Sequence, residues 1–326
     1  KDGFVLLASE MGVLDIPEEN IVRKWRLQPG KMLLIDLEKG KAISDEELKT
    51  ELASSHPYQE WLASTQIRVK DLPEVGRAPA VSPVPLLERQ QAFGYSQEDL
   101  KFLILPMAHT GQEATGAMGT DTPLSALSSR SKPLASYFKQ LFAQVTNPPL
   151  DAIREEVVTA VSSSVGPEAN LLAPGPDSCK QLSLPNPIIN NDELAKIIHI
   201  NDEGNHEGLQ AKVLSGLYRV ADGGPGLAAA LERLCAEASE AIDSGVRVIV
   251  LSDRNADTID APIPSLLLTA AVHHHLVRTK QRTMVGLIVE AGDAREVHHM
   301  ALLIGYGAGA INPYLAFESI EDLIAE

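Results

Sequence analysis

Polar side chains that could do chemistry stand directly after three apolar runs in the last third of this 326-residue chain. Asp253 and Arg254 follow one run, and Glu290 ends the next. Asn312, with Tyr314 two residues on, ends the third. If the runs are neighbouring parallel strands, these side chains meet at the carboxyl edge of the sheet, where ligands of such folds gather. Two interpretations stay open: a cluster that orients a polar substrate, or helix caps with an internal ion pair.

Other residue types with chemical potential are less specific. His273–His275 and His298–His299 are consecutive, and neighbouring helix residues point about 100° apart, so neither run places two metal ligands on one face. The glycines of 305–309 precede a predicted strand instead of following one, which favours a tight turn over a dinucleotide loop. The glycines of 111–119 lack the Lys-Ser or Lys-Thr pair of a phosphate loop. Cys235 fits a buried small hydrophobe.

The elements that must position the strand-end residues alternate between strands and helices. Strands are predicted over 211–217, 246–252, 284–290 and 308–312. Helices are predicted over 226–244, 264–279 and 294–304, with Gly245 and Gly305 at their C-termini. Near-continuous apolar strands that alternate with helices indicate parallel βα units, so the predicted fold class is α/β. The pattern does not distinguish a partial barrel from an open sheet.

A short, strand-rich part opens the chain at residues 1–61. Apolar runs at 4–8 and 31–37 predict strands, and Ser44 with Glu47 forms a capping box that predicts a helix over 45–54. Two strands and one helix cannot enclose a core. This part is therefore expected to pack on a partner or to complete a domain begun upstream.

The middle part, residues 62–182, is expected to be a helical linker region that leads into a βα sheet part, residues 183–326. Four prolines fall within residues 73–85, which is typical of a linker. Pro133 is well placed to begin a helix through residue 145, and the Thr-Asn-Pro-Pro sequence of 146–149 ends it. A second helix is predicted over 150–163.

Composition excludes several classes of function. The formal net charge of −16 disfavours nucleic acid and anionic membrane as partners. Only two cysteines occur, far apart, which disfavours structural zinc and a disulfide framework and fits a reducing, cytoplasmic compartment. The apolar runs are too short or too interrupted to span a membrane.

Several stretches, in order along the chain, resemble the large subunit of glutamate synthase. SEMGV (9–13), PGKMLLID (29–36) and HPYQEWL (56–62) resemble the end of its glutamine amidotransferase domain. GAMGTDTPLSALS (116–128), LFAQVTNPPLDAIREE (141–156), VIVLSDR (248–254) and AREVHHMALLIGYGAGAINPYLAFE (294–318) resemble its central domain.

The resemblance implies a non-catalytic connecting segment with an FMN-barrel-like fold that holds no flavin. In this family an N-terminal cysteine hydrolyses glutamine, ammonia is channelled, and 2-oxoglutarate is converted to glutamate on FMN with electrons delivered through an iron-sulfur cluster. The first residue here is Lys1 where the family has that cysteine, and the FMN and cluster residues of the family are expected to lie downstream of Glu326, so no catalytic residue is assigned here. Expected partners are the glutaminase and FMN domains of the same polypeptide, with a small NADPH-oxidising subunit as a further candidate.

By its position in the family, the turn of Thr146, Asn147 and Pro148 is a candidate for the wall of the ammonia tunnel, and a helix-breaking corner is the other interpretation. The alternative to the whole resemblance is a free-standing α/β enzyme or ligand-binding domain that uses Asp253, Arg254 and Glu290.

Overall fold

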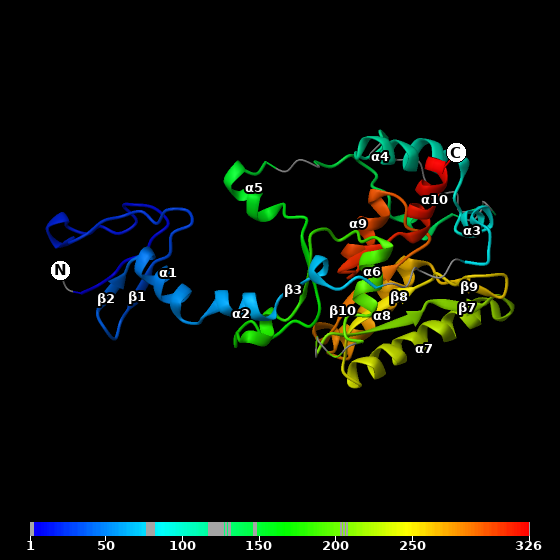
Figure 1. Cartoon of the computed structure of the whole chain (residues 1–326). Helices are drawn as coiled ribbons and strands as arrows, with labels where there is room; N and C mark the ends of the chain where they lie inside the picture. The colour runs from blue at the N-terminus through cyan, green and yellow to red at the C-terminus, as the bar shows by residue number, and fades with distance from the viewer. Residues whose placement is uncertain are drawn as a thin grey trace. The chain divides into compact units, whose positions relative to one another are not determined.

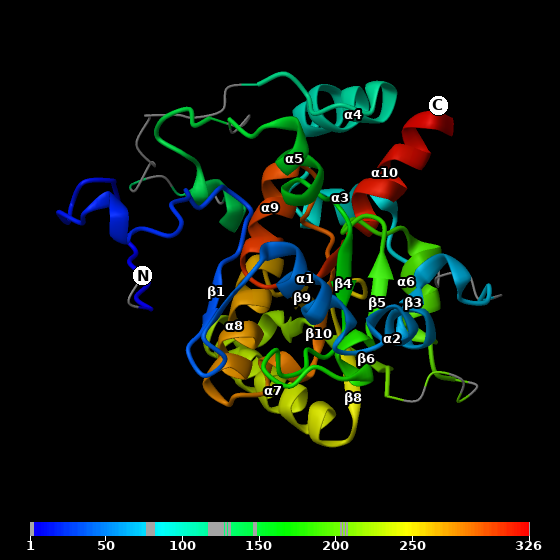
Figure 2. The same ribbon diagram turned by 90° about the vertical axis from the view of Figure 1, so that its left-hand side faces the viewer.

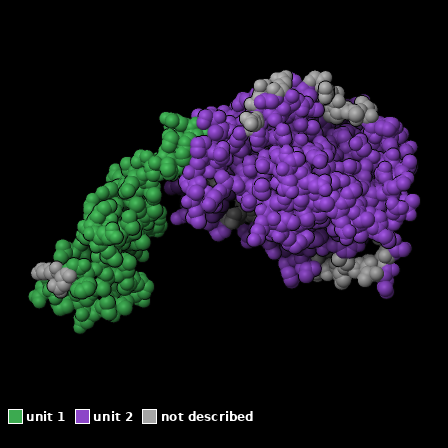
Figure 3. Space-filling model, turned by 90° about the horizontal axis from the view of Figure 1, so that it is seen from below, with its two compact units in different colours: residues 1–61 green, residues 62–326 purple. Residues whose placement is uncertain are grey.

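The computed structural model describes residues 3–75, 82–116, 127, 129, 132–145, 149–202, 204, 206 and 208–325. The chain divides into two compact units, residues 1–61 and residues 62–326, which Figure 3 colours separately. Among the described residues, no helix has the length and apolar character needed to cross a membrane.

Unit 1 has little regular structure. Strands β1 (Leu34–Asp36) and β2 (Lys41–Ile43) pair antiparallel, and helices α1 (Asp45–Ser54) and α2 (Tyr58–Thr65) follow, α2 running on past the unit's last residue. The Ser44 hydroxyl accepts a hydrogen bond from the Glu47 amide at 3.2 Å, so the predicted cap and helix are confirmed. The predicted strand at 4–8 is wrong, because that stretch has no regular structure and is exposed, with no neighbouring strand among the described residues to pair with.

The centre of unit 2 is a four-stranded parallel sheet in the order β11-β10-β8-β6. Its strands are β6 (Gln210–Ser215), β8 (Val246–Ser252), β10 (Gly286–Glu290) and β11 (Ala310–Asn312). The helices that join them are α7 (Gly223–Asp243), α8 (Ser265–Arg278) and α9 (Val297–Gly305), and α10 (Tyr314–Ala325) follows β11. The predicted α/β fold class is therefore confirmed (Figure 1).

Both faces of this sheet are covered, which explains its uninterrupted apolar strands. On one face α7, α8 and α9 pack on side chains such as Ile249, Leu287 and Val289. On the other face Val248 and Ile288 meet helix α6 (Asn191–Ile198) and a small sheet in the order β3-β5-β4. That sheet consists of β3 (Ile67–Arg68), β4 (Ser163–Val165) and β5 (Leu182–Leu184), and Figure 2 shows it beside α6.

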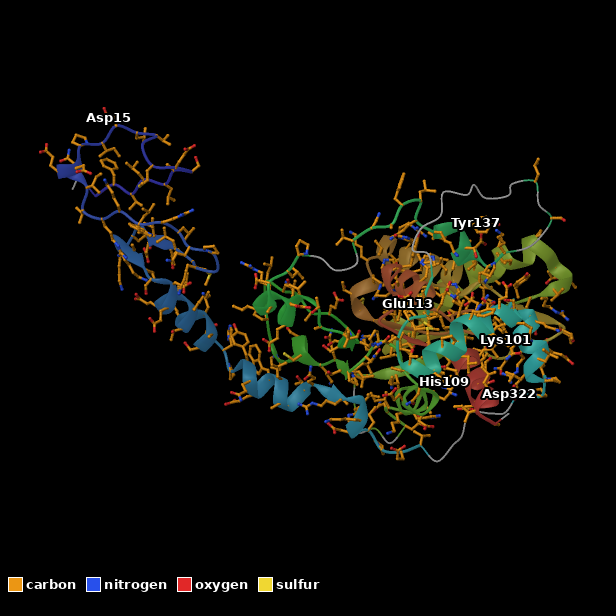
Figure 4. The ribbon with its side chains drawn as sticks, turned by 90° about the horizontal axis from the view of Figure 1, so that it is seen from above. Asp15, Lys101, His109, Glu113, Tyr137 and Asp322 are labelled. Atoms are coloured by element: carbon orange, nitrogen blue, oxygen red, sulfur yellow. The ribbon has the colours of Figure 1, made fainter. Side chains whose placement is uncertain are left out.

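A further group of helices closes the carboxyl edge of the parallel sheet. It consists of α3 (Leu86–Ala92), the π-helical stretch η3 (Asp99–Ile104), α4 (Leu105–Thr110) and α10. Figure 4 labels Lys101 on η3 and Asp322 on α10, two elements that pack together. Their apolar side chains form a separate core with Phe93 and Tyr95. Residues more than 200 positions apart are therefore joined at this edge.

The middle of the chain departs most from the prediction. Residues 62–182 contribute all of β3 and β4 as well as the start of β5, so this part is not simply a helical linker. The helix predicted over 133–145 is only a 3-10 turn, η4 (Leu134–Phe138), and the next helix, α5, covers Ala152–Val158. The strand predicted over 211–217 breaks at Gly216, after which β7 (Leu217–Arg219) pairs with β9 (Asp260–Pro262).

Two turns next to the parallel strands use glycine in a backbone conformation with positive φ. Gly245, the second residue after the end of α7, has a φ of +98°, as predicted for a helix C-terminus. At the end of α9 the positive φ, +110°, belongs to Gly307 and not to Gly305. A β-carbon at Gly307 would lie 2.2 Å from the His273 Nδ1 atom, so only glycine fits this turn.

Candidate functional site

The structure brings the predicted strand-end residues together at the carboxyl edge of β8, β10 and β11. Arg254 lies at the centre, with its side chain 15% exposed. Its Nε donates to Oε1 of Glu290, a carboxylate that is 8% exposed and also accepts from the Ser252 hydroxyl. Ser252 of β8 lies opposite Glu290 of the adjacent strand β10. The strand pairing therefore brings Arg254, two residues after Ser252, close to Glu290.

Two further groups accept hydrogen bonds from the Arg254 guanidinium. Nη1 donates to Oε1 of Glu318 on α10 at 3.0 Å, and Nη2 donates to Oδ1 of Asn191 at the start of α6 at 2.9 Å. The guanidinium also stacks over the Tyr314 ring, 4.2 Å from its centroid. Glu318 has a second cationic partner, Arg89 of α3. The sequence-predicted cluster is thus the centre of a larger ionic network.

Asn312 ends β11 beside this network and is fully buried. Its Nδ2 donates to the Ile189 carbonyl at 2.9 Å and to Oδ1 of Asn191 at 3.2 Å. Its Oδ1 is buried without a hydrogen-bond partner among the described residues. Asn191 therefore accepts from both Arg254 and Asn312 and joins the two parts of the predicted cluster.

Asp253 points away from Arg254 into a separate buried environment. Both of its carboxylate oxygens accept from the Gly292 amide, at 2.9 and 3.2 Å. Burial, reinforced by the nearby Asp293 carboxylate, raises the pKa of Asp253 well above its usual range. Asp253 and Arg254 are neighbours in sequence, yet the structure separates their side chains.

The space at the strand ends, where ligands of parallel α/β folds usually bind, is filled by the chain itself. The Phe93 ring lies so close to Gly292 that a β-carbon there would be 2.6 Å from it. The Tyr95 hydroxyl donates to the Gly292 carbonyl at 2.9 Å. Arg295 lies over the Tyr95 ring at 4.5 Å and donates to the Gly94 carbonyl at 3.0 Å. The segment that follows α3 thus occupies the position of a ligand.

The side chains at this edge are bound to one another and to the backbone. The donors of Arg254 are directed to protein acceptors, and Phe93 and Tyr95 lie against Gly292. Burial raises the pKa values of Tyr95 and Tyr314, so both hydroxyls stay protonated. The geometry is that of a structural network that fastens α3, α6 and α10 to the sheet.

The histidines make individual contacts instead of a shared site. His273 Nδ1 accepts from Arg282 at 3.0 Å, and burial together with Arg282 lowers the pKa of His273. His275 and the Ser239 hydroxyl are 2.9 Å apart, and His298 donates to the Ala135 carbonyl at 3.2 Å. Within the described part of the chain, no three metal-ligating side chains gather.

Other predicted positions have mixed outcomes. Cys235 is half-buried on α7 against the core, as predicted, and its burial raises the pKa of the thiol. The glycines of 305–309 form the turn between α9 and β11, as predicted. Thr146, Asn147 and Pro148 lie outside the described residues, as does the end of the stretch 111–119.

Sequence reasoning missed Arg89, Asn191 and Glu318, three members of the network. Asn191 follows Asn190, whose side chain caps α6 together with Glu193, and this capping box was the available sequence signal for that region. Arg89 and Glu318 are 229 residues apart and carry no local signal of their pairing.

Comparisons with known proteins cover the whole chain. Residues 88–326 match the family described as the glutamate synthase central domain, and residues 1–61 match the class-II glutamine amidotransferases. The chain is 44% identical, over its full length, to the glutamate synthase [NADPH] large chain of Bacillus subtilis, of which it covers 21%. It is 40% identical to the ferredoxin-dependent glutamate synthase 2 of Synechocystis, with 98% of this chain and 20% of that protein aligned.

A glutamate synthase [NADH] of Schizosaccharomyces pombe is 39% identical over the full chain, which covers 16% of that protein. The chain thus spans about a fifth of the length of these relatives. More than half of its residues fall within one family model, and the observed parallel α/β sheet lies inside that match. The chain belongs to the glutamate synthase central-domain family, and its residues 1–61 match the class-II glutamine amidotransferases.

Proposed function

We propose that the chain is the connecting segment of a glutamate synthase. It would join a glutaminase site to an FMN-dependent synthase site and help to wall the passage for ammonia. The parent reaction would convert glutamine, 2-oxoglutarate and a reductant into two molecules of glutamate. In this proposal residues 1–61 end the amidotransferase domain, residues 62–182 lead from it, and residues 183–326 form the βα sheet part.

The observation that carries the proposal is the filled carboxyl edge of the parallel sheet. Phe93 and Tyr95 occupy the place where a flavin or substrate would bind, and the Arg254 guanidinium is bound by Glu290, Glu318 and Asn191. A central domain of this kind contributes rigid surfaces instead of catalytic groups. FMN and the iron-sulfur cluster would therefore be held by other domains of the longer polypeptide.

The alternative, a free-standing enzyme that uses Asp253, Arg254 and Glu290, needs polar groups that face a substrate. Arg254 and Glu290 instead bind each other, and the Asp253 carboxyl accepts from the backbone of Gly292. The geometry disfavours this alternative.

A chimera tests the proposal directly. This chain would replace the aligned fifth of the Bacillus subtilis large chain, and glutamate formation from glutamine and 2-oxoglutarate would be measured after reconstitution. A connecting role predicts an active chimera and no stoichiometric FMN on the isolated 326-residue chain. An inactive chimera that still assembles and binds its flavin, or stoichiometric FMN on the isolated chain, would refute it.

The tunnel-lining role of Thr146, Asn147 and Pro148 is a separate part of the proposal and has its own readout. Asn147→Leu in the chimera would place an apolar side chain in the passage. The expected result is fewer glutamates formed per glutamine hydrolysed, with the glutaminase rate retained. An unchanged ratio would remove these residues from the tunnel wall.

A further inference from the structure

Five large apolar side chains are exposed within a nine-residue stretch that begins in the last two residues of η4. They are Tyr137, Phe138, Leu141, Phe142 and Val145, and they are between 40% and 80% exposed. Figure 4 labels Tyr137 at the start of this stretch. An exposed apolar group of this size, rimmed by polar residues, typically marks an interaction surface.

The spacing of the five side chains is helical. Positions 137, 141 and 145 are four residues apart, as are 138 and 142. At about 100° per residue all five fall within an arc of roughly 140° of a helix, and Lys139 and Gln140 fall on the opposite side. The segment 133–145, which we call the apolar strap, is therefore amphipathic as a helix.

The structure, however, has only a 3-10 turn at Leu134–Phe138 and no helical turn over 139–145. A helix of about 13 residues is marginal in water and depends on packing of its apolar face. Among the described residues, the Phe138 ring of that face meets the Tyr306 ring edge-on, with centroids 5.9 Å apart, while the five side chains stay 40% to 80% exposed. Because the face is this exposed, it gives the helix little of the packing that it needs.

The beginning of the strap is held in place. Leu134 packs against the core beneath α9, and the Ala135 carbonyl accepts from His298 Nε2 at 3.2 Å. Ordering of the remaining residues would thus extend an element that is already anchored. Anchoring of the first residues reduces the conformational entropy that is lost when the remaining residues become helical on binding.

We propose that the apolar strap completes an amphipathic helix when its apolar face docks on another domain of the longer polypeptide. This inference rests on the proposed connecting function. The relatives are about five times longer than this chain, so most of their surface lies outside it. A second copy of the chain is a poorer occupant, because two chains that each carry a net charge of −16 repel one another.

Amide hydrogen exchange tests the inference. The exchange rates of residues 137–145 would be measured by mass spectrometry in the isolated 326-residue chain and in the chimeric large chain described above. We expect at least tenfold slower exchange in the chimera. Equal rates in the two proteins, or an isolated chain that is already protected, would overturn the inference.

A matched pair of variants separates docking from general effects. Phe142→Asp and Gln140→Glu each add one negative charge, the first on the apolar face and the second on the polar face. Phe142→Asp should restore fast exchange in the chimera, and Gln140→Glu should not; equal behaviour would contradict the inference. Both variants should leave the melting temperature of the isolated chain unchanged, because both side chains are exposed.

The dependence of exchange on protein concentration tests whether a second copy of the chain covers the apolar strap instead. Protection of the strap that rises with the concentration of the isolated chain would assign the surface to a second copy and overturn the inference. Glutamate formation by the chimera is measured in the same samples, so failure of the connecting function is distinguishable from failure of docking.

Discussion

Replacement of Arg254 by leucine tests whether the strand-end cluster is a structural network. The substitution leaves the Glu290 carboxylate buried with only the Ser252 hydroxyl as a side-chain partner, whereas Glu318 keeps Arg89. Removal of one member of a buried ion pair costs about 3–5 kcal/mol. Because only one of the two carboxylates loses its cation, and Arg254 retains some exposure, we expect a loss near the lower end, about 3 kcal/mol.

A double-mutant cycle identifies the source of this loss. Glu290→Gln in the Arg254→Leu background removes the unpaired charge, so the double variant should regain about 1–2 kcal/mol relative to Arg254→Leu alone. Strictly additive effects of the two substitutions would refute the ion-pair reasoning, as would a loss below 1 kcal/mol for Arg254→Leu.

The assay exploits the position of the tryptophans. Trp25 and Trp61 are the only two in the chain, and both lie in unit 1. Urea unfolding followed by far-ultraviolet circular dichroism reports mainly the helices of unit 2, and tryptophan fluorescence reports unit 1. Arg254→Leu should lower the urea midpoint seen by circular dichroism and leave the dependence of tryptophan fluorescence on urea unchanged.

Three further predictions concern single side chains. Gly307→Ala should destabilise unit 2 by at least about 2 kcal/mol in urea unfolding, since the new methyl group meets His273 in a left-handed turn, whereas Gly305→Ala, with open space around it, should have little effect. The folded-state pKa of Asp253 is raised above its unfolded value of about 3.9, so the wild-type chain loses stability as the pH rises from about 4 through that pKa. Asp253→Asn lacks this loss, and its melting temperature relative to wild type should therefore increase between pH 4 and pH 8. Ser44→Ala removes the N-cap of α1 and should destabilise that helix by about 1 kcal/mol, seen as faster amide hydrogen exchange over residues 45–54 with the exchange of unit 2 unchanged.

Local patterns predicted the parallel sheet well. The strand 246–252 and the helices that begin near 226, 264 and 294 were found from apolar runs and glycine positions, because burial on both faces leaves a continuous apolar signature. The same rule predicted that Arg254, Glu290 and Asn312 would meet at one edge.

Long-range features were not accessible to this reasoning. The Phe93 segment that fills the strand ends is joined to Gly292 across about 200 residues, and nothing in its local sequence specifies that contact. The small sheet β3-β5-β4 was missed because its strands are only two or three residues long. The helix over 133–145 was predicted from Pro133 at its start and the Thr-Asn-Pro-Pro sequence after it, but among the described residues its apolar side chains stay exposed and the helix is not complete.

The contacts between α3 and α10 also have a mechanical consequence. Arg89 binds Glu318, and Gln90 donates to the Ser319 hydroxyl at 2.9 Å, so the first and last helices of the family-matched segment are fastened together. Tension applied between α3 and the end of α10 would load these two contacts before it reached the hydrogen bonds of the parallel sheet. Some 230 residues of folded chain thereby add little distance between the segments that flank them, as in domains that tolerate insertion into a longer polypeptide.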